Sequence, residues 1–245
     1  MRPVAPPART LLTAICLMLL TSCAMIPQPH EIPWSDRVYL HDDPVPGDFA
    51  VHRHEDGDYD NRWQVEKVEG DKVEVSLRVD VYVMGVSLDY TQHFVVDRDG
   101  TVLDAWVRYD DGRIESRPVA SRGQQGGLQD LRRVMVSPGY RIVTSAGAFN
   151  IDEGFGYTIV IDLGLGKTRA VRIDYLTADV PFRRVRTLDQ GSFDSGVLLD
   201  LMQNVAFAGS AQLNSASARL FEQTLADNMD SFDIIELHSF GRGAR

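Results

Sequence analysis

Two histidines that stand one residue apart are the first candidates for chemistry in this chain. On a strand, His52 and His54 would lie on the same face, about 6.6 Å apart along the chain. That spacing can hold zinc or copper if a third ligand such as Glu55 or Asp58 joins them. The other four histidines form no recognisable ligand pair. We therefore expect a surface-facing edge strand here, no metal site, and a domain that folds without metal.

A cluster of aspartates resembles part of a calcium-binding loop. Asp56, Asp58 and Asp60 have the one-three-five spacing of such a loop. However, Asn61 stands where the loop needs glycine, and Lys67 stands where a bidentate glutamate should complete the ligand set. We expect a solvated hairpin tip instead.

A glycine-rich segment, residues 164–168, resembles the end of a phosphate-binding P-loop. Ile161 occupies the position of the first glycine of that motif. The residues that follow, 170–175, alternate between apolar and polar like a strand, whereas a P-loop is followed by a helix. A hairpin turn is the better interpretation.

Nucleophilic catalysis has no signal in the sequence. There is no Gly-x-Ser-x-Gly elbow, and no pair of carboxylates stands out among the 35 acidic residues. The candidate bases His93 and His238 have no partner that spacing identifies. We therefore predict no catalytic residue and no cofactor, and an enzyme is the least favoured of the function classes.

Cys23 is the residue with the most definite predicted chemistry. The chain starts with basic residues (Arg2 and Arg9) and continues with an apolar run over Leu11–Leu20. That run has the length of a signal-peptide core, whereas a membrane-spanning helix needs roughly 20 residues. The run ends in Leu20-Thr21-Ser22-Cys23, which resembles the bacterial lipobox. An aliphatic residue stands three positions before the cysteine, and small residues lie between them.

The lipobox resemblance implies that residues 1–22 are removed as a signal peptide and that the sulfur of Cys23 carries lipid. Cys16 would be lost with the signal peptide, so the mature chain would have no disulfide. More than one acyl chain on Cys23 anchors a protein stably without a transmembrane segment. Ala24 resembles the sorting pattern for the outer membrane, which would place the protein there, facing the periplasm.

Composition limits the partners that the protein can take. The 25 Lys and Arg residues against 35 Asp and Glu residues give a net charge of −10, which disfavours nucleic acid. The apolar share of 44% is ordinary for a folded domain. We expect a proline-rich tether over residues 23–46 and a single globular domain over residues 47–241.

The strongest periodicity lies at residues 73–83, where apolar residues hold every odd position. This alternation predicts a long strand with one buried face, typical of an antiparallel sheet. Two runs of strands are expected around it: Phe49–His54, Trp63–Val68, Leu88–Val96 and Thr101–Tyr109, then Tyr140–Ser145, Tyr157–Leu163, Thr168–Leu176 and Phe232–Phe240. A mobile loop is expected at 121–127.

Helical spacing of apolar residues occurs only near the end of the chain, over 197–208 and 214–228. A strand over 197–208 stays an open alternative. The predicted fold class is mainly β (α+β). It consists of a curved antiparallel sheet of eight to ten strands, half-barrel or barrel-like, with one or two C-terminal helices packed on it.

Several short motifs resemble those of uncharacterised bacterial envelope lipoproteins: Pro46-Gly47-Asp48-Phe49, Ala146-Gly147-Ala148-Phe149, Val180-Pro181-Phe182 and the closing Phe240-Gly241. More remotely, the order of elements resembles the half-barrel of the lipoprotein localisation factors, in which a curved sheet encloses a cavity for acyl chains. That resemblance implies a similar fold and a similar ligand.

Two functions follow for a lipid-anchored envelope protein of this kind. One is a non-enzymatic binding module for a hydrophobic ligand or an acyl chain. The alternative is a structural or assembly accessory that docks an envelope complex through a sheet edge or the 123–127 loop. An apolar, unfilled cavity would favour the first function, and a packed interior with an exposed apolar patch would favour the second.

Overall fold

The structure is a computed structural model that describes residues 37–55, 59–83, 86–119, 128–134, 136–137, 139–162, 167–190, 223, 227 and 232–244. The described residues form thirteen strands and no complete helix. The first six are β1 (Phe49–His54), β2 (Tyr59–Glu69), β3 (Lys72–Val83), β4 (Val86–Asp97), β5 (Val102–Tyr109) and β6 (Ile114–Ser116). The others are β7 (Leu128–Val134), β8 (Arg141–Thr144), β9 (Gly147–Asn150), β10 (Glu153–Asp162), β11 (Lys167–Leu176), β12 (Arg184–Gln190) and β13 (Asp233–Gly241).

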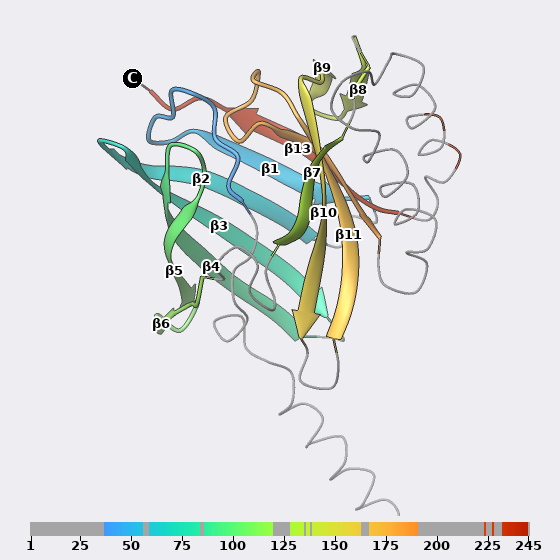
Figure 1. Cartoon of the computed structure of the whole chain (residues 1–245). Helices are drawn as coiled ribbons and strands as arrows, with labels where there is room; N and C mark the ends of the chain where they lie inside the picture. The colour runs from blue at the N-terminus through green and yellow to red at the C-terminus, as the bar shows by residue number, and fades with distance from the viewer. Residues whose placement is uncertain are drawn as a thin grey trace, which may run out of the picture.

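Eleven of these strands form one antiparallel sheet in the order β6-β5-β4-β3-β2-β1-β13-β12-β11-β10-β7. The first and last strands, β1 and β13, pair in its middle and join two meandering halves. The sheet is strongly twisted, so that β1, β2 and β3 run obliquely while β7, β10 and β11 stand nearly upright (Figure 1). Among the described residues the sheet ends at β6 and β7. It is therefore an open sheet, and the closed-barrel alternative is wrong.

The strand predicted at 73–83 is confirmed as β3, and its inner face is buried. Val73 and Val75 are fully buried, and Leu77 and Val79 are nearly so. We define the inner face of the sheet as the one that carries these side chains. The opposite face is not uniformly wet, however, because Ser76 is only 7% exposed. Its hydroxyl donates to Glu66 Oε1 at 2.5 Å, so this even position of the strand does not lie in solvent, contrary to what the alternation at 73–83 predicts.

Most predicted strands are present, and the structure adds others. β1 has the predicted bounds, while β2, β4 and β10 are longer than predicted. β6, β7, β9 and β12 were not anticipated, so the sheet has more than the expected eight to ten strands. β8 falls in the predicted Tyr140–Ser145 segment but pairs only with β9, in a separate two-stranded sheet that lies against β12 and β13.

The C-terminal helices stay predictions. Residues 197–208 lie outside the described residues, and so does most of 214–228. Only Gln223 and Asp227 of that second segment are described, both exposed and in helical conformation. In the described part of the chain, no helix has the length and apolar character needed to cross a bilayer. The loop predicted at 121–127 is also outside the described residues.

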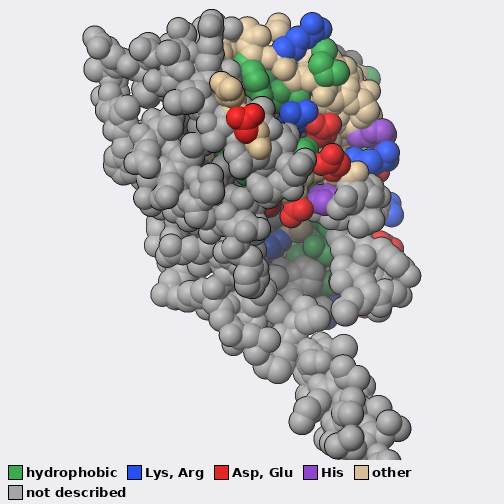
Figure 2. All heavy atoms as spheres, turned by 90° about the vertical axis from the view of Figure 1, so that its right-hand side faces the viewer, with side chains coloured by type: hydrophobic (Ala, Val, Ile, Leu, Met, Phe, Trp, Pro, Cys, Tyr) green, Lys and Arg blue, Asp and Glu red, His purple; other side chains and the backbone are tan. Residues whose placement is uncertain are grey.

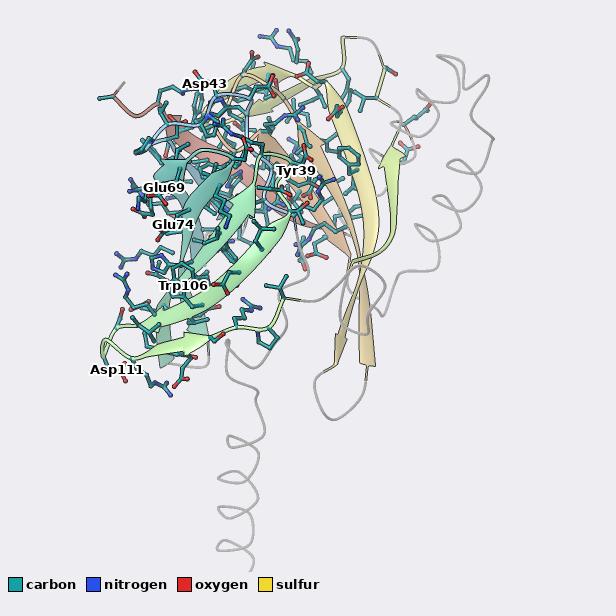
Figure 3. The ribbon with its side chains drawn as sticks, turned by 60° about the vertical axis from the view of Figure 1, so that its left-hand side comes forward. Tyr39, Asp43, Glu69, Glu74, Trp106 and Asp111 are labelled. Carbon is teal, nitrogen blue, oxygen red and sulfur yellow. The ribbon has the colours of Figure 1, made fainter. Side chains whose placement is uncertain are left out.

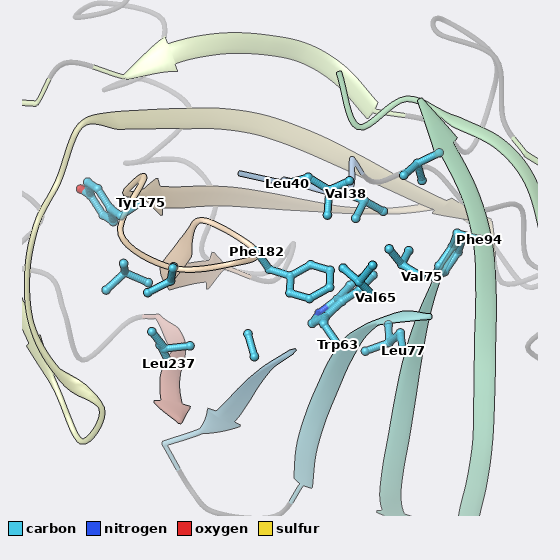
Figure 4. Packing of buried hydrophobic residues seen from close by; sticks show 14 of the residues in the cluster. Val38, Leu40, Trp63, Val65, Val75, Leu77, Phe94, Tyr175, Phe182 and Leu237 are labelled. Carbon is cyan, nitrogen blue, oxygen red and sulfur yellow. The ribbon is translucent and has the colours of Figure 1, made fainter. Parts of the chain in front are cut away.

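The main core lies on the inner face of β2, β3 and β4. The Trp63 ring stacks on Phe94 with centroids 5.8 Å apart and meets Phe182 at the same distance. Figure 4 shows Phe182 projecting between the two halves of the sheet, toward Trp63 and Val65. Aromatic contacts of this kind add to the stability that burial of apolar area provides.

Residues 37–48, which we call the strap, belong to the fold rather than to a tether. Val38 and Leu40 are 2% and 7% exposed and are part of the core. Figure 3 places Tyr39 between the two halves of the sheet and Asp43 at its upper end. The predicted boundary between tether and domain at 46/47 is therefore wrong for residues 37–46. The physical reason is that burying the apolar side chains of Val38 and Leu40, on either side of Tyr39, holds this segment in the core.

Candidate functional site on the inner face of the sheet

The strap occupies the inner face through backbone contacts at both ends. The Val38 N–H donates to the Gly100 carbonyl at 3.2 Å, and the His41 N–H donates to the Pro181 carbonyl at 3.0 Å. These two acceptors lie after β4 and before β12, in opposite halves of the sheet. The strap thus bridges the two halves across the face where the carrier hypothesis requires a cavity.

The Tyr39 side chain connects the strap to β10 and β12. Its ring stacks on Phe155, with centroids 6.2 Å apart. The Arg184 guanidinium lies 5.2 Å from the Tyr39 centroid, which is a cation–π contact. Tyr39 therefore faces the second half of the sheet, while Val38 and Leu40 join the core.

Arg184 also forms a buried ion pair with Asp174, which is fully buried on β11. Arg184 Nε lies 3.2 Å from Asp174 Oδ1, and the Thr187 hydroxyl donates to the same oxygen at 2.6 Å. Burying two charges is costly, so the attraction within such a pair is largely offset by the loss of hydration and adds little net stability. An acyl chain packed against these charged groups would exclude water from them and could not replace the lost hydrogen bonds, which is unfavourable.

A small cavity lies where the strap, β1, β2 and the start of β12 meet. Its lining consists of Arg37, Val38, Tyr39, His52, Trp63, Phe182 and Arg184. The space open to the centre of a water-sized sphere is about 10 Å³, which is room for about one water. Pockets for small molecules usually measure about 300–1,000 Å³. This cavity is therefore far too small for a lipid chain.

His52 borders this cavity and is only 2% exposed. Its Nε2–H donates to the Arg184 carbonyl at 3.0 Å. Burial lowers the pKa of His52 to about 4, and the nearby charge of Arg184 lowers it as well. The ring is therefore neutral at ordinary pH. β1 lies between β2 and β13, so the expectation that His52 and His54 face solvent from an edge strand is wrong.

The other half of the inner face also carries buried polar groups. Gln92 lies opposite Leu77 in the register of β3 and β4, which places it on the inner face, and it is 5% exposed. Its side-chain oxygen accepts a hydrogen bond from Arg117, which is 9% exposed. Burial lowers the pKa of Arg117 to about 10. Both halves of the inner face thus bury polar side chains among the apolar ones.

A second polar cluster, which we call the clasp, joins the strap to the end of β13. The Asp48 carboxylate is fully buried. It accepts from Val45 N–H at 3.0 Å, from His41 Nε2 at 2.8 Å and from Gly243 N–H at 2.8 Å. His41 Nδ1 accepts from the Asp43 N–H, which leaves the ring proton on Nε2, facing Asp48. The clasp also includes Arg242, whose Nε lies 3.3 Å from Asp48.

The candidate metal ligands that the structure describes do not form a cluster. No group of three or more His, Cys, Asp or Glu side chains suited to a metal occurs among the described residues. Asp60 accepts two hydrogen bonds from Arg53, at 2.8 and 2.9 Å. Asp56 and Asp58 lie outside the described residues. Residues 163–166 of the glycine-rich segment do too, but Asp162 pairs with Lys167, as expected of a hairpin.

The two candidate bases have different surroundings. His93 is 6% exposed and stacks on Trp106, with centroids 5.2 Å apart and ring planes 2° apart. Burial lowers the pKa of His93, and the charge of Arg108 lowers it as well, while Glu74, 3.9 Å away, opposes this shift.

His238 Nδ1 is hydrogen-bonded to Ser145 Oγ at 2.9 Å. The two residues are 93 positions apart, so spacing could not have identified the pair. Ser145 lies in the exposed turn between β8 and β9. Among the described residues no carboxylate is hydrogen-bonded to His238, so the pair lacks the third group that orients a catalytic histidine.

Sequence reasoning did not single out Asp174, Arg184 or Arg117 as site residues. Each depends on partners from other strands, and no local spacing indicates such a contact. Cys23 lies outside the described residues, so its lipidation stays a prediction.

Comparison with known proteins gives two similar structures. No family model matches the chain, and no curated protein sequence matches it. A presumed lipoprotein from Parabacteroides distasonis ATCC 8503 shares 10% identity at a TM-score of 0.42, covering 83% of this chain and 99% of that one. A presumed exported protein with YmcC-like fold, from Bacteroides fragilis NCTC 9343, shares 10% identity at a TM-score of 0.40. That match covers 84% of this chain and 100% of that one.

Proposed function

We propose that this protein is a lipid-anchored, non-enzymatic component of the cell envelope that docks a protein partner. Its anchor is the lipid on Cys23, and its location is the outer membrane, facing the periplasm. It acts as a structural or assembly accessory rather than as a carrier of lipid.

The observation that carries this proposal is the filled inner face. The strap and Phe182 occupy the space between the two halves of the sheet, and the cavity left among them has room for about one water. Asp174 and Arg117 add buried charge to the same face. A carrier of acyl chains needs an apolar cavity at this place, and the cavity lined by the strap, β1, β2 and the start of β12 is far smaller than that.

The surface of the described residues carries charges of both signs and a few exposed apolar side chains. Figure 2 shows acidic and basic side chains interspersed on one face of the molecule. Three large apolar side chains are exposed among the described residues: Leu103 at 50%, Ile114 at 59% and Val143 at 66%. Leu103 and Ile114 lie on β5 and β6, at one edge of the sheet, whereas Val143 lies on β8.

Mass spectrometry under native conditions separates a carrier from an accessory. The wild-type protein is purified from the envelope fraction in detergent and its intact mass is measured. We expect the mass of the lipidated polypeptide alone. One equivalent of bound lipid would overturn the proposal in favour of carriage.

Cross-linking in intact cells tests the docking itself. A photoreactive amino acid is placed in the lipidated protein at Leu103, Ile114 or Val143 in turn. If the protein docks its partner through one face, an adduct of one defined mass should form from one side of the molecule only. That side is either the β5–β6 edge or β8. Absence of an adduct at all three positions, or equal diffuse labelling at all three, would contradict the proposal.

A further inference from the structure

The strap lies between the predicted lipid anchor at Cys23 and the sheet. When it is docked, its residues do not add to the length of the tether. Arg37 is 14 residues after Cys23, and Phe49, the first residue of β1, is 26 residues after it. An extended chain spans at most about 3.5 Å per residue. The upper limit on the reach from Cys23 is therefore about 50 Å to the start of the strap and about 90 Å to the start of β1.

We propose that the strap sets the distance between the domain and the bilayer. When it is docked, the domain stays within about 50 Å of the anchored cysteine, and when it is released, the domain reaches out to about 90 Å. This inference rests on the proposed lipidation of Cys23. It explains why a segment with the composition of a tether is built into the core.

The contacts of the strap determine where the chain leaves the fold. Arg37 Nη2 donates to the Asp99 carbonyl at 2.7 Å, and Val38 N–H donates to the Gly100 carbonyl. The first described residues of the strap are therefore held beside the turn between β4 and β5. Beyond this point, burial of Val38 and Leu40 resists pulling from the anchor. The clasp at Asp48 forms a second point of attachment.

Gly100 provides a specific way to release the strap. It has a φ of +78°, and a Cβ at this position would lie 1.9 Å from the Val38 carbonyl oxygen. Backbone atoms cannot move aside easily, so Gly100→Ala forces the strap away from the turn. Gly112 is the matched control, because it has a φ of +84° and no atom lies within 4 Å of its Cβ position. Both substitutions strain a backbone with positive φ, but only one collides with the strap.

The first measurement is trypsin cleavage after Arg37. Full-length lipidated protein is bound to vesicles of phosphatidylethanolamine and phosphatidylglycerol, and release of a fragment that starts at Val38 is followed by mass spectrometry. Docking protects this bond because Val38 is buried. We expect release from Gly100→Ala to be about tenfold faster than from wild type, the ratio that a shift of about 1.4 kcal/mol in strap opening produces. Gly112→Ala should match the wild-type rate.

The second measurement is the distance from the bilayer. A dye on Val143→Cys, in the exposed β8 strand, transfers energy to acceptors in the vesicle. Transfer should fall in Gly100→Ala and stay unchanged in Gly112→Ala. Insertion of twelve flexible residues between Ala24 and Arg37 of the wild-type chain is the positive control, because it adds the length that release of the whole strap, clasp included, provides; Gly100→Ala frees at most that length.

The outcomes separate the two proposals. If the protein does not attach to vesicles, the predicted lipid anchor at Cys23 is absent and the proposed function fails. A chain that attaches, but whose Gly100→Ala and Gly112→Ala forms behave alike in both measurements, overturns the role of the strap. Val38→Asp serves as an independent second variant. If both strap variants lose their folded near-ultraviolet signal, the strap is an inseparable part of the fold and the proposal is also overturned.

Discussion

Burial of the His52 imidazole couples the stability of the fold to pH. The pKa of His52 falls from 6.5 to about 4 because burial disfavours the charged ring. Between these values the unfolded chain binds a proton that the folded chain does not. The free energy of unfolding therefore falls as the pH drops from 6.5 to about 4, and the contribution is fully present above 6.5. The shift corresponds to about 3 kcal/mol in total.

Replacing His52 by glutamine should remove this acid sensitivity. The glutamine amide can still donate to the Arg184 carbonyl but has no proton to gain, so the variant should lose less stability between pH 7 and pH 4.5 than wild type does. Urea unfolding at the two pH values measures the difference. Equal losses in both proteins would show that His52 is not the group responsible.

Cys23 carries the second prediction at the scale of single residues. A fatty-acid probe supplied to growing cells should label the wild-type protein and should not label Cys23→Ala. Cys16→Ala is the control, because that residue lies in the segment predicted to be removed, and it should be labelled like wild type. Labelling of Cys23→Ala at the wild-type level would show that Cys23 is not the lipidated residue.

At the scale of elements, β3 shows how strongly one strand depends on its inner face. Four successive odd positions, Val73 to Val79, are at most 7% exposed. β3 pairs with β2 and β4 along its length, so both neighbours depend on the same register. A one-residue slip would move all four apolar side chains to the other face.

An aspartate on this inner face should be severely destabilising. Val79→Asp buries a carboxylate among apolar side chains, and we expect a loss of about 3 kcal/mol or more. Val143→Asp is the matched control, since Val143 lies in a strand but is 66% exposed. We expect it to cost about 1 kcal/mol or less. Similar urea midpoints for the two variants would mean that the inner face is wrongly assigned.

For the whole molecule, the clasp joins segments from both ends of the described chain. The Asp48 carboxylate contacts Gly243, 195 residues away. Burial by itself would raise the pKa of Asp48, but hydrogen bonds from Val45, His41 and Gly243, together with the charge of Arg242, lower it overall. The ionised carboxylate is therefore favoured in the fold. Its contribution is present above pH 3.8 and is lost as the pH falls through the lower folded pKa.

Asp48→Asn tests the clasp. At pH 7 the variant should lose about 1–3 kcal/mol of unfolding free energy, because a buried group with several donors loses its charge. Amide exchange should then rise in residues 41–45 and in 242–243 together. Asp60→Asn, which breaks the exposed pair with Arg53, should cost less than about 1 kcal/mol. A rise in exchange at only one of the two segments would show that the clasp does not couple them.

Local patterns alone were enough to predict much of the sheet. The alternation at 73–83 correctly predicted the buried face of β3. The bounds of β1 and the hairpin between β10 and β11 were also predicted correctly. Such features have a period of two or depend on turn residues, so neighbouring positions in the chain contain the information. The predicted lipid site at Cys23 comes from the same kind of local pattern.

The tertiary structure decided which polar residues are buried and which segments cover the inner face of the sheet. His52 is buried because the strap, Phe182 and Arg184, which is 132 residues later, pack around its ring, and no spacing near His52 encodes these contacts. The proline-rich composition of 23–46 predicted a tether, yet Val38 and Leu40 pack into the core once both halves of the sheet are in place. Contacts between distant segments depend on how the whole chain folds, so only the tertiary structure shows that the strap bridges the two halves of the sheet.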